Sequence, residues 1–274
     1  MSSRSLSQEA EENRVVALDS RESRVKKPEA KIICILPNKG GFGKNTLAVG
    51  VGVSLARLNL RTLSLELDAS PGDLAGLFDL DPASSLEQAI NSSCNPSQYI
   101  HKIFDKLYVL LGPQDPLRGE MIKKEELERL VRVLAEQYDV IIFDTQPVLS
   151  DITLDAIKMS QETLVVSEPY LESVRRIAIM LDLLSTRFGV YTRNFKLLIN
   201  KYRRLDPRRL TLRDVAAGSS LPIFWLVPFD KKCRNSMQQM RQGKLSRAHV
   251  VRSLMKLAVE ICPDAWASDV RRWV

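Results

Sequence analysis

The sequence predicts an α/β fold, namely a doubly wound, mainly parallel sheet of about seven strands with helices on both faces. Short apolar runs typical of strands recur along the chain, and segments with apolar residues at helical spacing separate them. A glycine-rich loop also joins the first apolar run to a helix-like segment. Strands separated by helices of this length favour parallel pairing in a doubly wound sheet.

The strand-like runs occur at regular intervals. In chain order they lie at residues 31–36, 62–67, 107–112, 140–144, 163–167, 195–200 and 223–228. The glycine-rich loop is followed by a segment that fits a buried helix, residues 45–58. Further helices with one apolar face are expected at residues 124–137, 171–188 and 249–261.

The length and composition suit one domain. The chain has 274 residues, 45% of them hydrophobic and 27% charged, which is ordinary for a soluble protein with a sizeable core. Residues 1–28 mix serine with charges of both signs, so we expect a flexible leader that ends at Pro28. The folded domain is predicted to span residues 29–262, and residues 263–274 are predicted to form a C-terminal tail.

No apolar run approaches the roughly 20 residues needed to cross a bilayer, and the N-terminus lacks the apolar stretch of a signal peptide. We therefore expect a cytoplasmic protein. The four cysteines are far apart and form no C-x-x-C pair, which predicts reduced thiols rather than a zinc site or a disulfide framework.

The stretch "NKGGFGKNTLA", residues 38–48, predicts a phosphate-binding loop. Its glycines let the backbone turn tightly and direct N–H groups at phosphate oxygens, and the helix that follows adds its positive N-terminal end. Lys44 would neutralise charge on the β- and γ-phosphates. The alternative interpretation is a purely structural turn.

Polar or turn-forming residues also follow later strands. Asp68, Asp144, Asn200 and Pro228 come at or just after the ends of the second, fourth, sixth and seventh predicted strands. Ligand sites of such sheets lie beyond the C-terminal strand ends, so we expect these residues to converge on the glycine-rich loop. Taken singly, each could instead be a helix cap or a turn former.

With Lys39 ahead of the glycines, "KGGFGK" resembles the deviant Walker A motif of the ParA and MinD superfamily. Residues 65–90, 138–184 and 200–215 most resemble the CpaE and TadZ branch, the ATPases of Tad-type pilus assembly. The likeness covers roughly residues 31–261. It implies a P-loop NTPase fold of the MinD type, with ATP and Mg²⁺ as cofactors.

The resemblance also implies roles for individual residues. Lys39 would reach across a face-to-face homodimer to the partner's nucleotide, so that dimer formation depends on ATP. Asp68 would orient the attacking water, which makes Lys39, Lys44 and Asp68 the catalytic residues, and Asp144 would hold magnesium through water. Asn200 and Pro228 would contact adenine. The rest of the nucleotide site would be Gly40, Gly41, Phe42, Gly43, Asn45 and Thr46, with Thr46 bonded to an α-phosphate oxygen.

Three residues depart from the family pattern: Asn45 stands where Thr or Ser is usual, Glu66 where Asp is usual, and Gln146 where a second Pro is common. Magnesium prefers near-ideal octahedral geometry, and Asn45 offers it a longer carbonyl arm than a hydroxyl does. Thr46 cannot replace it, because one helical step rotates a side chain by about 100°. We therefore predict a metal site with Asn45 and Asp144, and slow or conditional ATP hydrolysis. The alternative is that Asn45 serves magnesium adequately and turnover is ordinary.

The function predicted from this resemblance is a nucleotide-dependent dimeric switch that localises or assembles a cellular machine, first of all a Tad-type pilus. Its partner would be a pilus-assembly or polar-localisation protein, and the switch would be recruited to a cell pole or the inner membrane face. One alternative is a ParA-like DNA-partitioning ATPase or a MinD-like ATPase for division-site or flagellar placement. Another is an ATP-bound scaffold that does not hydrolyse.

The net charge is +7, and two segments concentrate basic residues. Residues 201–213 carry six basic residues against one acid, and residues 231–247 carry six against none. These segments suit an acidic partner protein, DNA or an anionic membrane. They could equally be ordinary solvated faces.

Overall fold

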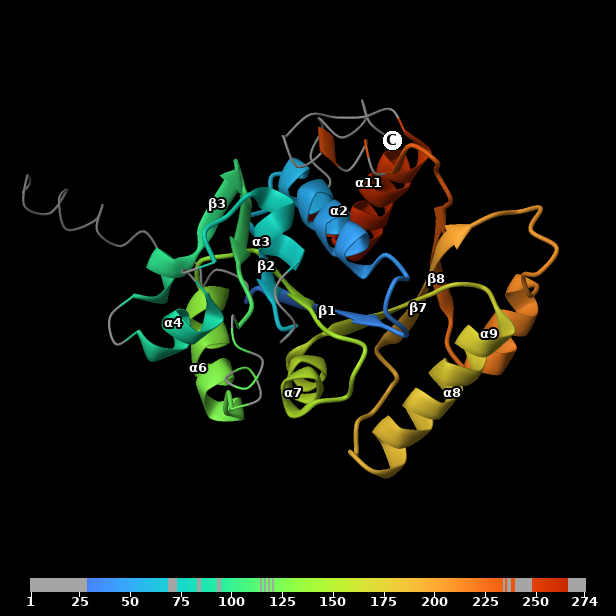
Figure 1. Cartoon of the computed structure of the whole chain (residues 1–274), viewed down its shortest axis with the longest axis horizontal. Helices are drawn as coiled ribbons and strands as arrows, with labels where there is room; N and C mark the ends of the chain where they lie inside the picture. The colour runs from blue at the N-terminus through green and yellow to red at the C-terminus, as the bar shows by residue number, and fades with distance from the viewer. Residues whose placement is uncertain are drawn as a thin grey trace, which may run out of the picture.

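A computed structural model of the chain describes residues 29–68, 73–82, 85–92, 95–113, 115, 117, 119, 121–233, 235, 238–239 and 248–265. An eight-stranded sheet runs through this part of the chain, with helices on both faces (Figure 1). The predicted doubly wound, mainly parallel fold is confirmed. The predicted leader (1–28) and most of the predicted tail lie outside the described residues.

The strands follow the order β3-β4-β2-β5-β1-β6-β7-β8 across the sheet. Every neighbouring pair is parallel except β3 and β4. The strands are β1 (Lys31–Pro37), β2 (Thr62–Glu66), β3 (His101–Phe104), β4 (Leu107–Leu110), β5 (Val140–Asp144), β6 (Glu162–Ser167), β7 (Phe195–Tyr202) and β8 (Ile223–Pro228).

All seven predicted strands are present, and β3 is the additional one. It forms an antiparallel hairpin with β4 at the edge of the sheet. Its four residues are half-buried or exposed, so they do not form the apolar run that marks the buried parallel strands.

The predicted helices at 45–58, 124–137, 171–188 and 249–261 correspond to α2 (Lys44–Arg57), α6 (Lys124–Ala135), α8 (Leu171–Thr186) and α11 (His249–Ile261). Shorter helices connect the other strands. They are α3 (Asp73–Phe78), α4 (Leu86–Asn91), α7 (Asp151–Met159) and α9 (Leu212–Ser219), with the 3-10 turns η1 (Pro96–Tyr99) and η2 (Pro263–Ala265).

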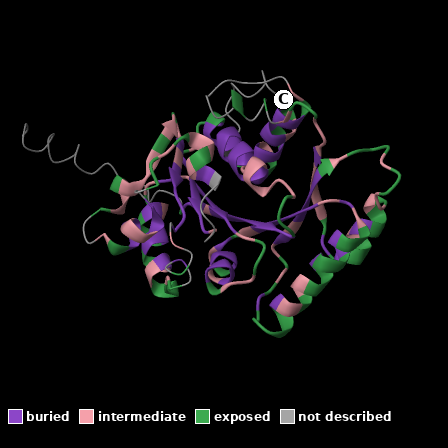
Figure 2. Cartoon of the chain, viewed as in Figure 1, coloured by how far each residue is buried: buried purple, intermediate pink, exposed green. Residues whose placement is uncertain are grey.

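The central strand β1 shows how the core is divided. Ile33 and Ile35 belong to the cluster that contains α2 and α11, whereas Cys34 and Leu36 belong to the cluster of α7, α8 and α9 on the other face. Successive side chains of a strand point to opposite faces. Both faces of β1 are covered by helices (Figure 2), which explains why its sequence is continuously apolar rather than alternating.

The topology places the candidate site. After β1 the chain forms α2 and returns at β2, beyond β5, whereas β6, β7 and β8 extend the sheet on the other side of β1. The loops that follow the parallel strands therefore meet at one edge, beside the point where the strand order diverges. Within the described ranges, no helix is long and apolar enough to cross a membrane.

Candidate functional site

The glycine-rich loop joins β1 to α2 and requires glycine at two positions. Gly41 and Gly43 have φ values of 82° and 83°, in the left-handed region that favours glycine. A Cβ atom on Gly43 would also lie 2.6 Å from Nδ2 of Asn200. Backbone conformation therefore explains the glycine at position 41, and backbone conformation together with close packing against Asn200 explains the glycine at position 43.

The start of α2 is suited to an anion. Gly43 precedes the helix and has no side chain to cap it, and the first turn contains no acidic residue. The helix is 14 residues long, and the partial positive charge of its N-terminal N–H groups lies next to the loop. A phosphate group is the ligand that such a helix end binds well.

Lys44 lies between two carboxylates. Its Nζ is 3.1 Å from Oδ2 of Asp68 and 3.1 Å from Oδ1 of Asp144. Asp144 is fully buried as the last residue of β5, and Asp68 follows β2. Burial alone lowers the pKa of Lys44, but the two carboxylates outweigh burial and raise that pKa, so the lysine stays protonated. Three of the predicted residues therefore form one cluster.

Glu66 lies behind this cluster. It is opposite Asp144 in the β2–β5 register and is 1% exposed. Its carboxylate accepts hydrogen bonds from the backbone N–H groups of Gly112 (3.0 Å) and Leu74 (3.3 Å). Burial raises the pKa of Glu66 to about 7, and the charge of Asp144 adds to this, although the N–H groups oppose it. Glu66 thus links the end of β2 to α3 and to the segment after β4, a role that its strand-end position does not reveal.

Asn200 contacts the loop, as predicted. Nδ2 of Asn200 donates to the carbonyl oxygen of Phe42 at 2.7 Å. Pro228 ends β8, one strand farther out, opposite Tyr202 in the register. The adenine contacts of both residues remain predictions.

The beginning of the loop is fixed by Asn38, which the sequence analysis did not single out. Its backbone N–H donates to the carbonyl of Val166 at 3.0 Å, and its Nδ2 donates to the carbonyl of Ser173 at 2.8 Å and to Oγ of Ser167 at 3.2 Å. The loop is therefore tied to β6 and α8 before the glycines begin. The sequence feature that could have indicated this role is that Asn38 is a polar residue directly after the first apolar strand.

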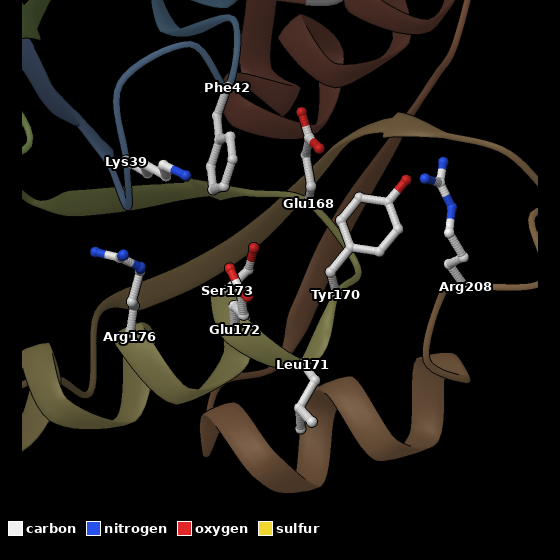
Figure 3. Close-up of a pocket in the computed structure, with 9 residues that line it drawn as sticks. All are labelled: Lys39, Phe42, Glu168, Tyr170, Leu171, Glu172, Ser173, Arg176 and Arg208. Atoms are coloured by element: carbon white, nitrogen blue, oxygen red, sulfur yellow. The ribbon is translucent and has the colours of Figure 1, made fainter.

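Gly40 is exposed, and so is Lys39. It lines a pocket of about 600 Å³ between the loop, the end of β6 and the start of α8 (Figure 3). Phe42 also enters this pocket from the loop, and Arg176 enters it from α8. The other lining residues are Glu168, Tyr170, Leu171, Glu172, Ser173 and Arg208.

Asn45 and Thr46 lie half-buried in the first turn of α2, next to Lys44. Among the described residues, no group of three or more His, Cys, Asp or Glu side chains could hold a metal. The oxygens of Asn45 and Asp144 are nevertheless donors of the kind that magnesium accepts, and magnesium is commonly held by one or two carboxylates together with substrate phosphates and water. These residues fit a magnesium ion that arrives with a nucleotide.

Comparisons with known proteins agree with this fold. Residues 30–188 match the family described as "AAA domain". The septum site-determining protein MinD of Thermotoga maritima is 26% identical over 210 residues, covering 72% of this chain and 74% of that protein.

Solved structures of a MinD protein and of a ParA family ATPase share the fold. The MinD structure from Pyrococcus horikoshii, in complex with Mg-ADP, has a TM-score of 0.72 at 20% identity and covers 86% of this chain and 97% of that one. A ParA family ATPase from Chlorobium tepidum also has a TM-score of 0.72, at 18% identity, and covers 84% of this chain and 98% of that one.

The fold, the glycine-rich loop and the paired strand-end carboxylates define a P-loop ATPase-like nucleotide-binding protein. Within that class, the chain belongs to the ParA/MinD superfamily, whose AAA domain it carries. The family predicted from the loop residues is therefore confirmed.

Proposed function

We propose that this protein is an ATP-binding, nucleotide-dependent dimeric switch with slow or conditional hydrolysis. The observation that carries the proposal is the Lys44 ammonium group between Asp68 and Asp144, at the uncapped start of α2. Phosphoryl transfer depends mainly on charges positioned in this way.

Each residue of the site would have its own role in ATP hydrolysis. Lys44 would exchange carboxylate contacts for phosphate oxygens, Asp144 would hold the magnesium ion through water, and Asp68 would orient the attacking water. Magnesium, when bound, neutralises charge on the transferred phosphoryl group. Asn45 replaces the hydroxyl that usually meets the ion, and this favours slow turnover over the alternative of ordinary turnover.

The surface around Lys39 supports an ATP-dependent homodimer. Lys39 is exposed and lines the pocket, which suits a residue that contacts a partner's nucleotide. Exposed apolar side chains occur in the segments after β5, β6 and β7, at the same edge of the sheet. They are Val148 (58% exposed), Leu171 (50%) and Leu205 (92%). Apolar groups at one edge are typical of a surface that another molecule covers.

The machine that the closed dimer would serve is proposed to be a Tad-type pilus, because residues 65–90, 138–184 and 200–215 resemble the CpaE and TadZ branch. The switch would then meet a pilus-assembly or polar-localisation protein at a cell pole or the inner membrane face. The relatives named MinD and ParA favour a second candidate, an ATPase that acts in division-site placement or DNA partitioning.

The basic segment 201–213 is a candidate surface for an acidic partner, DNA or an anionic membrane. Some of its basic side chains form contacts close to the segment itself. Cζ of Arg203 lies 3.4 Å from the ring centroid of Phe229, and the Arg209 guanidinium donates to the carbonyl oxygen of Arg204. Arg208 pairs with Asp206 (Nε to Oδ1, 3.5 Å), yet its side chain is 81% exposed, so the rest of its guanidinium group can meet an anionic partner. The second basic segment, 231–247, lies mostly outside the described residues.

The proposal is tested by titrating the purified protein with ATP and magnesium by calorimetry and by measuring its mass in solution with ATPγS or ADP. We expect ATP to bind, dimers to form with ATPγS only, and Lys39→Ala to bind ATP yet stay monomeric. Absence of ATP binding would overturn the proposal. Salt-sensitive binding of the ATPγS dimer to duplex DNA or to anionic vesicles would select the partitioning or division-site candidate over the pilus.

A further inference from the structure

Lys201, next to Asn200 in β7, has a backbone conformation that lysine rarely adopts. Its φ is 53°, in the left-handed region. Residues held in such conformations cluster at functional sites, where the surrounding structure maintains them. The side chain of Lys201 has two partners: its Nζ donates to the carbonyl oxygen of Gly41 at 2.8 Å and lies 2.8 Å from Oε1 of Glu168.

Two successive residues of β7 thus hold two successive carbonyl groups of the glycine-rich loop. Lys201 holds the carbonyl of Gly41, and Asn200 holds that of Phe42. In a trans peptide unit the C=O and the following N–H point in opposite directions. The two contacts therefore also set the directions of the N–H groups of Phe42 and Gly43, which are turned away from β7.

We propose that Lys201, itself held by Glu168, is a positioning residue that fixes the phosphate-binding amides of the loop before nucleotide arrives. The inference rests on the proposed nucleotide function. A loop ordered in advance loses less conformational freedom on binding, so the expected benefit is affinity for the phosphates. Glu168 contributes by holding the ammonium group at the end of β6, beside the loop.

A purely structural ion pair is the alternative, and exposure argues against it. The Lys201 side chain is 43% exposed, and ion pairs in contact with solvent contribute little to stability. A matched control lies on the same strand. Lys196, near the start of β7, is 31% exposed and pairs with Oε2 of Glu162 at 3.0 Å, but it lies over the ring of Phe224 and not beside the loop.

The test compares Lys201→Met, Lys201→Arg, Glu168→Gln and Lys196→Met with the wild type. Calorimetry measures the affinity of each protein for Mg-ATP and for adenosine, which lacks phosphates. We expect Lys201→Met to weaken ATP binding by roughly tenfold or more, a loss typical of one charged hydrogen bond, and to leave adenosine binding unchanged. Lys201→Arg should retain most of the ATP affinity, Glu168→Gln should lose a smaller part, and Lys196→Met should bind as the wild type does.

Hydrogen exchange of the nucleotide-free proteins gives an independent readout. We expect the amides of residues 40–46 to exchange faster in Lys201→Met than in the wild type or in Lys196→Met. Unchanged ATP affinity together with unchanged exchange would overturn the inference, and so would an equal loss of ATP affinity in Lys196→Met. If the wild type does not bind ATP, the proposed function fails instead, and the exchange experiment alone decides whether Lys201 orders the loop.

Discussion

Nζ of Lys44 lies 3.1 Å from the fully buried carboxylate of Asp144, and it lies equally close to Asp68. The lysine of the glycine-rich loop thus neutralises a buried negative charge in the nucleotide-free protein. Its side chain is itself only 11% exposed, so both charges of the Lys44–Asp144 pair are largely removed from water. We therefore expect Lys44 to matter for stability as well as for the proposed nucleotide binding.

Lys44→Met is expected to destabilise the nucleotide-free fold by about 3 kcal/mol, because removing one member of a buried ion pair leaves the other charge uncompensated. Urea unfolding measures the free energy. The double variant Lys44→Met with Asp144→Asn should regain most of the loss, since the buried charge of Asp144 is then absent as well. If the double variant instead lost the sum of the free energies lost by Lys44→Met alone and Asp144→Asn alone, the interaction between Lys44 and Asp144 would not stabilise the fold.

Asn45→Thr is expected to raise the ATP turnover rate by about 10²–10³, if the restored magnesium contact is worth ~3–4 kcal/mol in the transition state. ATP affinity should change less, because the loop amides and Lys44 are unaltered. Phosphate release under saturating Mg-ATP is the measurement, with Asn45→Ala as the control for loss of the amide. Equal turnover in the wild type and Asn45→Thr would establish that asparagine serves magnesium well enough.

Gly43→Ala is expected to be more damaging than Gly189→Ala, although both glycines have positive φ. Alanine in this region costs about 1–2 kcal/mol at either site. At Gly43 the new methyl carbon would also meet Asn200 at 2.6 Å, whereas at Gly189 it meets nothing within 4 Å. Thermal unfolding should show a larger loss of stability for Gly43→Ala than for Gly189→Ala. Only Gly43→Ala should bind ATP more weakly than the wild type. Similar behaviour of the two variants would contradict close packing at Gly43.

Glu66 should make stability depend on pH. Its pKa is raised from 4.5 to about 7, so the folded protein binds more protons than the unfolded chain between these values. The stability that Glu66 contributes to the fold is fully present below pH 4.5. It falls by about 3 kcal/mol as the pH rises to about 7, at ~1.4 kcal/mol per pH unit.

Glu66→Gln removes this titration. In unfolding experiments with EDTA and without nucleotide, the variant should gain stability relative to the wild type between pH 5 and pH 8. Asp144 and Lys44 face Glu66 and are present in both proteins, so the comparison isolates the effect of the Glu66 carboxyl group. A constant difference in unfolding free energy across this range would mean that Glu66 titrates at its ordinary pKa in the fold.

Patterns in single segments predicted much of this molecule. The apolar run of β1, the glycines at 40, 41 and 43 and the lysine at 44 predicted a strand, a phosphate-binding loop and a helix, and all three elements are present. The positions of the strand-end residues predicted that Asp68 and Asp144 would converge on the glycine-rich loop, and both lie beside its Lys44. These predictions succeeded because buried parallel strands and left-handed glycine turns leave local signatures.

Tertiary structure decided what has no local signature. The edge strand β3 lacks an apolar run. Asn38 and Lys201 form hydrogen bonds with residues more than a hundred positions away in the sequence. The Glu66 carboxylate accepts hydrogen bonds from backbone N–H groups of two other segments. The sequence by itself determined the fold class, the family and the loop, because each depends on residues that are neighbours in the chain. Only the tertiary structure determined which side chains hold the loop and which carboxylate is buried, because these depend on strands that pair across the sheet.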